Sequence, residues 1–458
     1  MPVNQLESWI SLQIGLPRKT ILSRGVLRRW QRERLLQTIA LARENSPWYR
    51  QRLRNVSLPD NADIEQILRA LPLLTSDDLR DHDQEMLCSS QAEIQRVITL
   101  QSSGTTASPK RLFFTAKDLR HTTGFFQHGM RLVAAPQDCV LVMLPSTKDY
   151  DVGSLLVNAL HQAGFSAHVQ WPAHEPQIVA QAVRTIQANC LIGLPHHILS
   201  LARDTALAQD ISRYVRRVLL CSDYTAPVVR QAIAHKLECR VHEHYGSTES
   251  GLGGAVECSA GTGCHIREND LLFEVVDPST GEQLPDRAEG ELVFSTITRS
   301  GMPLLRYRTG DRGSITHSRC SCGSVLARLQ NLNGRLKDMA WLPTGEQLTM
   351  AELDQALLSS PWITGYEAVL DDEPNAGDAQ SPPNSTPKTV LRLRIKALTS
   401  KASWKQEKVK ADLLGIPAIH RAITYGSMRI AVTDHHDPLF PSHTVKRHLQ
   451  DNRNQPLG

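Results

Sequence analysis

The sequence predicts an α/β protein of layered sheets, because short apolar strands alternate with amphipathic helices through residues 116–240. A β-rich stretch follows at 272–316, and a smaller α+β unit of helices and strands closes the chain. The 458 residues are enough for a large core and a second domain. Ligands of such sheets collect beyond the carboxyl ends of the strands, so we expect the functional site in the loops that follow them.

The composition is that of a globular protein without a strong charge bias. Hydrophobic residues make up 41% of the chain and charged residues 21%, the ordinary balance of a soluble protein. The formal net charge of +4 is small for this length, so we expect no nucleic-acid partner. No stretch reaches the roughly 18–20 apolar residues of a membrane span, and no signal peptide is evident. We therefore expect a cytoplasmic protein with no membrane partner, whose nine cysteines are free thiols or metal ligands.

The N-terminal part is predicted to be helical. Apolar residues recur at helical spacing through residues 25–55, with many arginines between them. A basic helix can bind membranes or nucleic acid, but the stripe of Leu35, Leu36 and Ile39 favours a helix packed on the main domain.

A hairpin is expected next. After a helix started by Thr75 or Ser76, residues 96–100 form an apolar strand and residues 112–115 its partner. The two strands would hold the turn between them at a sheet edge.

The alternation that follows has the order that parallel sheets require. We expect helices at 117–134, 152–163 and 176–188, and strands at 139–144, 167–170, 190–193 and 218–221. Pro145 and the segments 193–195 and 221–223 then fall at carboxyl ends of strands.

The turn of the hairpin is the first candidate for binding. It concentrates small hydroxyl residues and glycine and ends in a lone cation: Ser102, Ser103, Gly104, Thr105, Thr106 and Lys110. Backbone N–H groups and hydroxyls in such a loop can surround phosphate oxygens, while a lysine neutralises their charge. The spacing differs from a Walker A loop, and the alternative is an ordinary surface turn.

Further motifs follow in a fixed order: His244–Glu249, Leu305–Asp311 and Gly334–Asp338. With the hydroxyl-rich loop, they resemble the adenylate-forming superfamily of acyl-CoA synthetases, luciferases and nonribosomal adenylation domains. Asn45–Tyr49, Leu71–Leu79 and Met302–Asp311 are similar to signatures of its phenylacetate-CoA ligase and coenzyme F390 synthetase branch. The resemblance runs from about residue 28 to the C-terminal end.

The resemblance implies a role for each motif residue. Tyr245 would stack on the purine, Gly246 would belong to the same nucleotide-binding motif, and the loop with Ser222 and Asp223 would border the adenine. Thr248 would contact the α-phosphate and Glu249 would ligate Mg²⁺. Asp311 would bind the ribose hydroxyls, and Arg335 would lie near ribose or phosphate. Lys337 would lie at a hinge, and Lys446 would be the catalytic lysine. Taken alone, Tyr245 would be read as a core residue, Asp311 as a turn cap, and Lys446 as the start of a final helix.

The hinge implies two domains. Residues 1–334 would form the adenylating (AMP-binding) domain with its β-rich subdomain, and residues 335–458 a small mobile α+β domain. Within the latter, Thr349 and Glu352 form a capping box. We expect its strands at 366–370, 389–395 and 428–432 and a helix at 402–413.

A metal site is expected in the β-rich region. Cys258, His265, Cys320 and Cys322 provide three thiolates and an imidazole, which suit a structural Zn²⁺ with four ligands. Members of the branch carry such a cluster, so the resemblance supports this set. Cys264 or His317 could replace one ligand, and the alternative is a group of unpaired thiols.

The resemblance implies an AMP-forming carboxylate ligase that uses ATP, Mg²⁺ and a thiol acceptor, CoA or a carrier protein. The same scaffold also allows AMP transfer to a cofactor hydroxyl, as in coenzyme F390 synthetase, or a nucleotide-binding protein without activity. A homodimer is a candidate assembly. Residues 145–153 lack the Tyr/Phe/Gly-rich run associated with phenylacetate enzymes, so the acid is left open, as are the acceptor and the oligomeric state.

Overall fold

The computed structural model describes residues 4–18, 20–100, 109–372, 389–398, 403–434 and 448–453. Several residues singled out above lie outside these ranges: Ser102, Ser103, Gly104, Thr105, Thr106 and Lys446.

An eleven-stranded sheet forms the centre of the molecule, with the order β10-β11-β12-β13-β9-β8-β7-β6-β5-β3-β4. Its second half is parallel, as the alternation predicts. This half consists of β3 (Cys139–Met143), β4 (Ser166–Val169), β5 (Cys190–Gly193), β6 (Arg217–Leu220) and β7 (Arg240–Tyr245).

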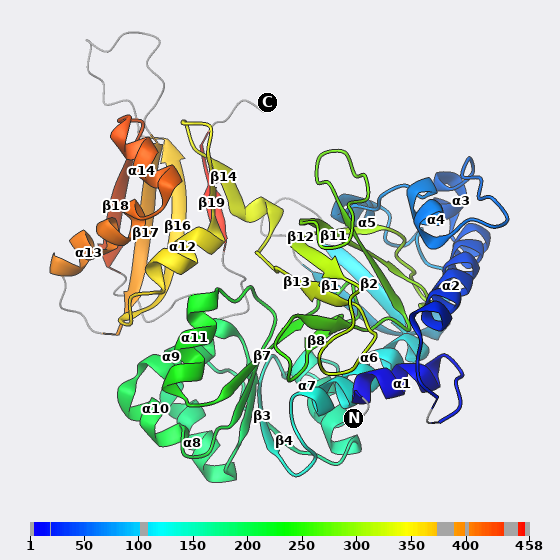
Figure 1. Cartoon of the computed structure of the whole chain (residues 1–458), viewed down its shortest axis with the longest axis horizontal. Helices are drawn as coiled ribbons and strands as arrows, with labels where there is room; N and C mark the ends of the chain where they lie inside the picture. The colour runs from blue at the N-terminus through cyan, green and yellow to red at the C-terminus, as the bar shows by residue number, and fades with distance from the viewer. Residues whose placement is uncertain are drawn as a thin grey trace, which may run out of the picture.

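Helices cover both faces of the parallel half (Figure 1). One face carries α8 (Pro176–Ile186), α9 (Pro195–Arg203), α10 (Thr205–Ile211) and α11 (Pro227–Lys236), and the other α1 (Gln5–Gln13), α6 (Ala116–Gly129) and α7 (Val152–Gln162). Strand side chains alternate between two buried clusters, with Leu141 and Met143 in the first and Val140 and Val142 in the second. The α/β prediction is therefore confirmed.

The β-rich region continues the same sheet in antiparallel form. It contains β8 (Ala255–Glu257), β9 (Cys264–Ile266), β10 (Leu271–Val276), β11 (Gly290–Thr296), β12 (Tyr307–Thr316) and β13 (Arg328–Gln330). The expected basic helix becomes α2 (Arg24–Asn45) and α3 (Pro47–Arg52), because Ser46 caps a new helix with Pro47 at its first position. Leu35 and Ile39 are buried in a core shared with the β-rich strands, so the helix packs on this region.

Two shorter helices and a hairpin complete the N-terminal part. They are α4 (Ile64–Ala70), α5 (Ser76–Asp81), β1 (Ile94–Leu100) and β2 (Lys110–Thr115), where β1 and β2 pair antiparallel. Thr75 caps α5, and the hairpin lies where the sequence predicts it.

A separate four-stranded sheet, β18-β17-β16-β19, forms the C-terminal part at the upper left of Figure 1. It consists of β16 (Ile363–Asp372), β17 (Thr389–Ala397), β18 (Met428–Asp434) and β19 (Leu449–Asp451), with α12 (Met350–Leu357), α13 (Ser403–Leu414), α14 (Pro417–Thr424) and the hairpin β14 (Met339–Trp341)–β15 (Gln347–Thr349). The Thr349 capping box is present. In place of a final helix after Lys446, the described chain ends in β19, which pairs with the free edge of β16.

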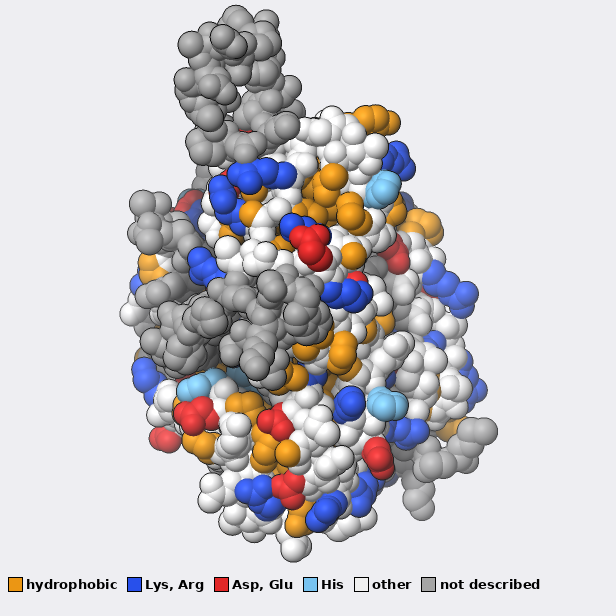
Figure 2. Space-filling view, turned by 90° about the vertical axis from the view of Figure 1, so that its left-hand side faces the viewer, with side chains coloured by type: hydrophobic (Ala, Val, Ile, Leu, Met, Phe, Trp, Pro, Cys, Tyr) orange, Lys and Arg blue, Asp and Glu red, His pale blue; other side chains and the backbone are white. Residues whose placement is uncertain are grey.

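The C-terminal part packs on the parallel half. Ile198 and Leu199 of α9 share a buried cluster with Leu357 and Ile363, and Arg203 donates a hydrogen bond to the Leu358 carbonyl. Figure 2 shows the molecule from the left-hand side of Figure 1. On the described part of that surface, acidic and basic side chains are interspersed. Among the described residues, no helix combines the length and the apolar character that crossing a bilayer requires.

Candidate functional site

A cavity opens at the carboxyl ends of β6 and β7. Its other side is formed by residues 332–338, which lead from the eleven-stranded sheet into the C-terminal part. Predicted site residues from distant parts of the sequence line it: Ser222, Asp223, Tyr245, Gly246, Asp311 and Arg335. Met350 and Asp354 of α12 line it as well, so both parts of the molecule contribute. The position agrees with the rule that ligands of α/β sheets bind beyond the strand ends.

Asp311 lies at the centre of the polar wall. The Tyr245 hydroxyl donates to Asp311 Oδ2 (2.8 Å), and Arg335 Nε lies 3.1 Å from Asp311 Oδ1. Burial, together with the charge of Asp311, raises the pKa of Tyr245 well above its ordinary value, so the phenol remains a donor. A carboxylate fixed in this way keeps lone pairs that can accept from two neighbouring hydroxyls of a ligand.

The backbone at the strand ends is shaped to approach a ligand closely. Ser222, directly after β6, has φ of +71°, a left-handed conformation that is uncommon for a residue with a side chain. At Gly246, after β7, a Cβ atom would lie 2.8 Å from His244 Cε1 and 3.0 Å from Gly253 Cα. Only glycine fits there without displacing its neighbours.

Glu249 and Lys110 form a buried ion pair beside this cavity. The Tyr307 hydroxyl donates to Glu249 Oε1 (3.1 Å), and Lys110 Nζ lies 3.3 Å from both the Tyr307 hydroxyl and Ser76 Oγ. Burial alone would raise the pKa of Glu249, but the charge and hydrogen bond of Lys110 lower it to about 2. The carboxylate is therefore ionised at neutral pH. Thr248 is half-buried, and its hydroxyl has no partner among the described residues.

Sequence reasoning assigned Lys110 to the phosphate loop, gave Tyr307 no role, and considered Ser76 only as the start of a helix. The pairing of Lys110 with Glu249 depends on the hairpin and β12 meeting in three dimensions. Tyr307 lies within the motif Leu305–Asp311, so its place in that motif is the sequence signal that could have indicated a role in the site.

The predicted hinge residue Lys337 is exposed in the short helix η3 (Leu336–Asp338). Next to it, Asp338 Oδ1 lies 2.7 Å from Nδ1 of His448. His448 begins the last described segment, two residues after Lys446 in the sequence.

A small apolar cavity of about 60 Å³ adjoins the polar one. Both are lined by Ser222, His244 and Gly246. The walls of the apolar cavity come from α6, the short helix η2 (Met130–Leu132), α7 and the parallel strands, including Phe125, Phe126, Met130, Leu156 and Ile192. Of the segment 145–153, Val152 lines it, whereas Lys148 is exposed and does not.

The site therefore combines a polar cavity at the strand ends, a buried carboxylate and an adjoining apolar cavity. The family model described as "AMP-binding enzyme" matches residues 52–299, more than half of the chain. The chain belongs to the AMP-binding enzyme family. The resemblance to the adenylate-forming superfamily is thereby confirmed.

Curated relatives of this AMP-binding enzyme are phenylacetate-coenzyme A ligases. The protein from Thermus thermophilus is 29% identical over 364 residues, covering 77% of this chain and 80% of the relative. The protein from Pseudomonas putida is 28% identical over 331 residues, covering 68% and 71%. These similarities agree with the branch that the sequence motifs indicate.

A solved structure of 2-hydroxyisobutyryl-CoA ligase, in its postadenylation state with an acyl-AMP, shares the fold. Its TM-score is 0.73 at 18% identity, covering 94% of this chain and 91% of that chain. The likeness extends over both parts of the AMP-binding enzyme and confirms the predicted fold class.

The enzyme also brings the predicted metal ligands together. The ligand atoms of Cys258, His265, Cys320 and Cys322 all lie within 4.8 Å of one another. The Cys258 and Cys320 sulfurs are 3.8 Å apart, and Cys322 Sγ is 3.4 Å from His265 Nε2. Three sulfurs and one imidazole nitrogen at this spacing fit a tetrahedral Zn²⁺.

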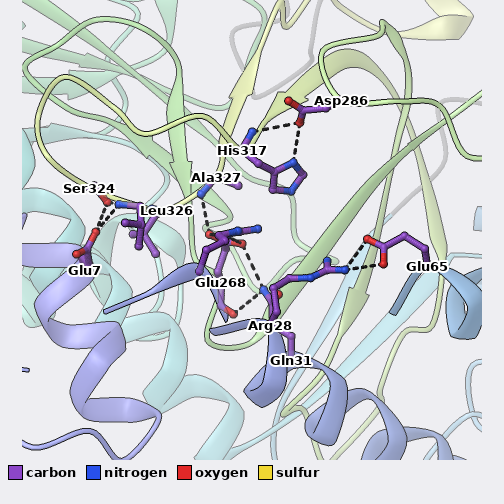
Figure 3. Close-up of polar contacts among 12 residues, drawn as sticks. Glu7, Arg28, Gln31, Glu65, Glu268, Asp286, His317, Ser324, Leu326 and Ala327 are labelled. Carbon is purple, nitrogen blue, oxygen red and sulfur yellow. Dashed lines mark hydrogen bonds and ion pairs between the residues drawn. The ribbon is translucent and has the colours of Figure 1, made fainter. Parts of the chain in front are cut away.

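The two alternative ligands point elsewhere. Cys264 Sγ contacts the Glu243 carbonyl at 3.4 Å. His317 Nδ1 lies 2.6 Å from Asp286 Oδ1 on the surface, as Figure 3 shows.

The loop that carries two of the cysteines is held by the first helix. The buried Glu7 of α1 accepts from Ser324 Oγ (2.5 Å) and from the Val325 N–H (2.7 Å) (Figure 3). Asn4, which caps α1, also donates to Cys322 Sγ at 3.5 Å. Sequence reasoning missed both residues, because nothing local connects them to the cysteines.

Proposed function

We propose that this enzyme activates a carboxylic acid with ATP as acyl-AMP and then transfers the acyl group to CoA. The observation that carries the proposal is one polar cavity, lined by Tyr245, Asp311 and Arg335, which adjoins an apolar cavity across Gly246. A nucleotide and an acyl chain would then meet at the shared wall. The similarity to phenylacetate-CoA ligases supports CoA as the acceptor.

In the first half-reaction the carboxylate oxygen of the acid attacks the α-phosphorus, and the bond to pyrophosphate breaks. Asp311 would accept from the ribose hydroxyls, while the Ser222–Asp223 loop and Tyr245 border the base. Thr248 would offer its hydroxyl to the reacting phosphate. These contacts position the reactants, which is a large part of catalysis in phosphoryl transfer.

Glu249 is the residue that would hold Mg²⁺, because an ionised buried carboxylate is a suitable oxygen ligand. The ion would neutralise charge on the phosphates. We further propose Lys446 as the lysine that stabilises the developing charge on the α-phosphate.

In the second half-reaction the CoA thiolate attacks the acyl carbon, and AMP leaves. We propose that residues 335–458 form a domain that rotates about Lys337 between the two steps, relative to a domain of residues 1–334. The exposure of Lys337 and the separate sheet of the C-terminal part support this division.

The acid that fits best is small and apolar beyond its carboxylate. The acyl cavity is walled by Phe125, Phe126, Met130 and Leu156, and Lys148 is exposed outside it. A second carboxylate on the substrate would find no cation among these walls.

The test is ATP–pyrophosphate exchange with a panel of small apolar acids, followed by identification of the product formed with CoA. We expect acid-dependent exchange and an acyl-CoA product. Lys446→Ala should reduce exchange at least about 100-fold. AMP attached to a hydroxyl acceptor would instead indicate adenylyl transfer, and absence of exchange with every acid would contradict the proposal.

Asp311→Ala should raise the KM for ATP at least about tenfold, because two charge-assisted hydrogen bonds to the ribose are lost. The KM for the acid should change little, since Asp311 does not line the apolar cavity. An unchanged KM for ATP in a variant with normal thermal stability would contradict the assignment.

We also propose that Cys258, His265, Cys320 and Cys322 hold a structural Zn²⁺. The cluster lies at the junction of β8, β9 and the loop before β13, away from the residues that line the nucleotide cavity. All four positions of a tetrahedral ion are filled by protein, which is typical of a structural site.

A further inference from the structure

A cationic cavity of about 370 Å³ lies at the amino ends of β6 and β7. Its charged and polar walls include Gln5, Arg131, Arg217, Arg240 and His242, and residues 132–136 complete the lining. Among the described residues no carboxylate lines it. A volume of this size falls in the range of about 300–1,000 Å³ that small-molecule sites occupy.

The sheet register places the positive groups on one face. Arg217 and Arg240 begin neighbouring parallel strands and lie directly opposite each other, which is unfavourable for like charges. His242 follows Arg240 by two residues, so its side chain points to the same face. A bound anion between the two side chains would offset this repulsion.

The protein supplies only part of that charge. Asp138 pairs with Arg217 at 2.9 Å, whereas the side chain of Arg240 has no partner among the described residues. Arg131 donates to the Ala163 carbonyl (3.0 Å), but its buried Nε has no described partner. Three guanidinium groups against one carboxylate leave two positive charges uncompensated.

His242 adds an unused polar atom. The residue is 2% exposed, and its Nδ1 has no hydrogen-bond partner among the described residues. Burial, with the charges of Arg240 and Arg230, lowers the pKa of His242 to about 4, so the ring is neutral at physiological pH. A neutral imidazole has a single N–H, and the Glu257 carbonyl is an acceptor for it, so His242 lines the cavity without adding charge.

We propose that Arg131, Arg217 and Arg240, beside the neutral ring of His242, form a second anion site, which binds the phosphate group of a small molecule. Guanidinium forks match phosphate oxygens, and a phosphate dianion balances the excess charge. The site is separate from the nucleotide cavity, because Arg240 and Tyr245 occupy opposite ends of β7. At about 3.3 Å per residue these ends are about 17 Å apart.

The test titrates the full-length protein with inorganic phosphate and with pyrophosphate by calorimetry, at constant ionic strength and with saturating AMP present. We expect the wild type to bind at least one of these probes with one-to-one stoichiometry. Arg240→Gln should weaken this binding at least tenfold. The exposed Arg213 lies outside the cavity, so Arg213→Gln is the matched control and should bind as the wild type does.

Arg240 is exposed, so its substitution should leave folding intact, which circular dichroism checks. Equal affinity in Arg240→Gln and the wild type would overturn the proposal. So would the absence of binding of both probes to the wild type, or an equal loss in Arg213→Gln. Because neither arginine lines the nucleotide cavity, ATP–pyrophosphate exchange should be unchanged in both variants.

Discussion

Glu249→Gln should reduce acid-dependent ATP–pyrophosphate exchange at least about 100-fold, because it removes the negative charge proposed to hold Mg²⁺ at the phosphates. The amide keeps the shape and one acceptor oxygen, so the loss reports the charge. The pKa of Glu249 is held near 2, below its ordinary value of 4.5. The ion pair with Lys110 therefore stabilises the fold above about pH 4.5, and this contribution disappears as the pH falls to about 2. Between pH 6 and 9 the defect should not change with pH.

The neighbours of Glu249 provide the controls. Removing one partner of a buried ion pair is destabilising by about 3–5 kcal/mol, and Glu249→Gln leaves Lys110 unpaired. The double variant Lys110→Met, Glu249→Gln should recover much of the thermal stability but none of the exchange activity. Tyr307→Phe, which removes one hydrogen bond and keeps the charge, should lower the rate far less. Wild-type exchange in Glu249→Gln would rule out the proposed role.

Loss of the metal cluster should be the largest effect on stability. Cys258→Ser should abolish stoichiometric zinc and lower the free energy of unfolding by about 3–5 kcal/mol, because the energy of binding a structural zinc is folding energy. Elemental analysis of the purified protein and chemical denaturation measure the two quantities. Prolonged treatment of the wild type with a strong chelator should reproduce the loss of stability, and zinc should restore it.

Cys264→Ser is the matched control for this prediction. Cys264 is adjacent to the ligand His265, but its sulfur contacts the Glu243 carbonyl and does not belong to the cluster. The variant should retain one zinc per chain. If Cys258→Ser retains zinc, or if the wild type purified without chelator contains none, the cluster is a group of free thiols.

The features that sequence predicted well depend on local patterns. The alternation of β3 to β7 with helices and the Thr349 capping box require only neighbouring residues. The strand β19 was missed, because three residues gain their structure by pairing with β16. Propensity could not indicate that partner.

In the candidate site, too, features that depend on local motifs were predicted and features that depend on long-range contacts were not. Motifs identified Tyr245, Asp311 and Arg335, and the structure places their side chains in contact. The ion pair between Lys110 and Glu249 could not be foreseen, because it depends on how the hairpin meets the main sheet. Cysteine spacing suggested a metal site, but only the fold excludes Cys264 and His317 from it.

The attachment of α1 has a consequence for biosynthesis. Asn4 and Glu7 bind residues 318 and 317 positions later in the chain, respectively. At about 5–20 residues per second, a ribosome needs about 15–60 s to make the intervening polypeptide. Leu6 and Ile10, fully buried in the finished protein, share their cluster with Phe125 and Met130, which are made early, and with Leu326, which is made late. Helix α1 can therefore pack on α6 early in synthesis, whereas its polar attachment to the cysteine loop and the completion of its apolar cluster by Leu326 must wait until translation has passed that residue.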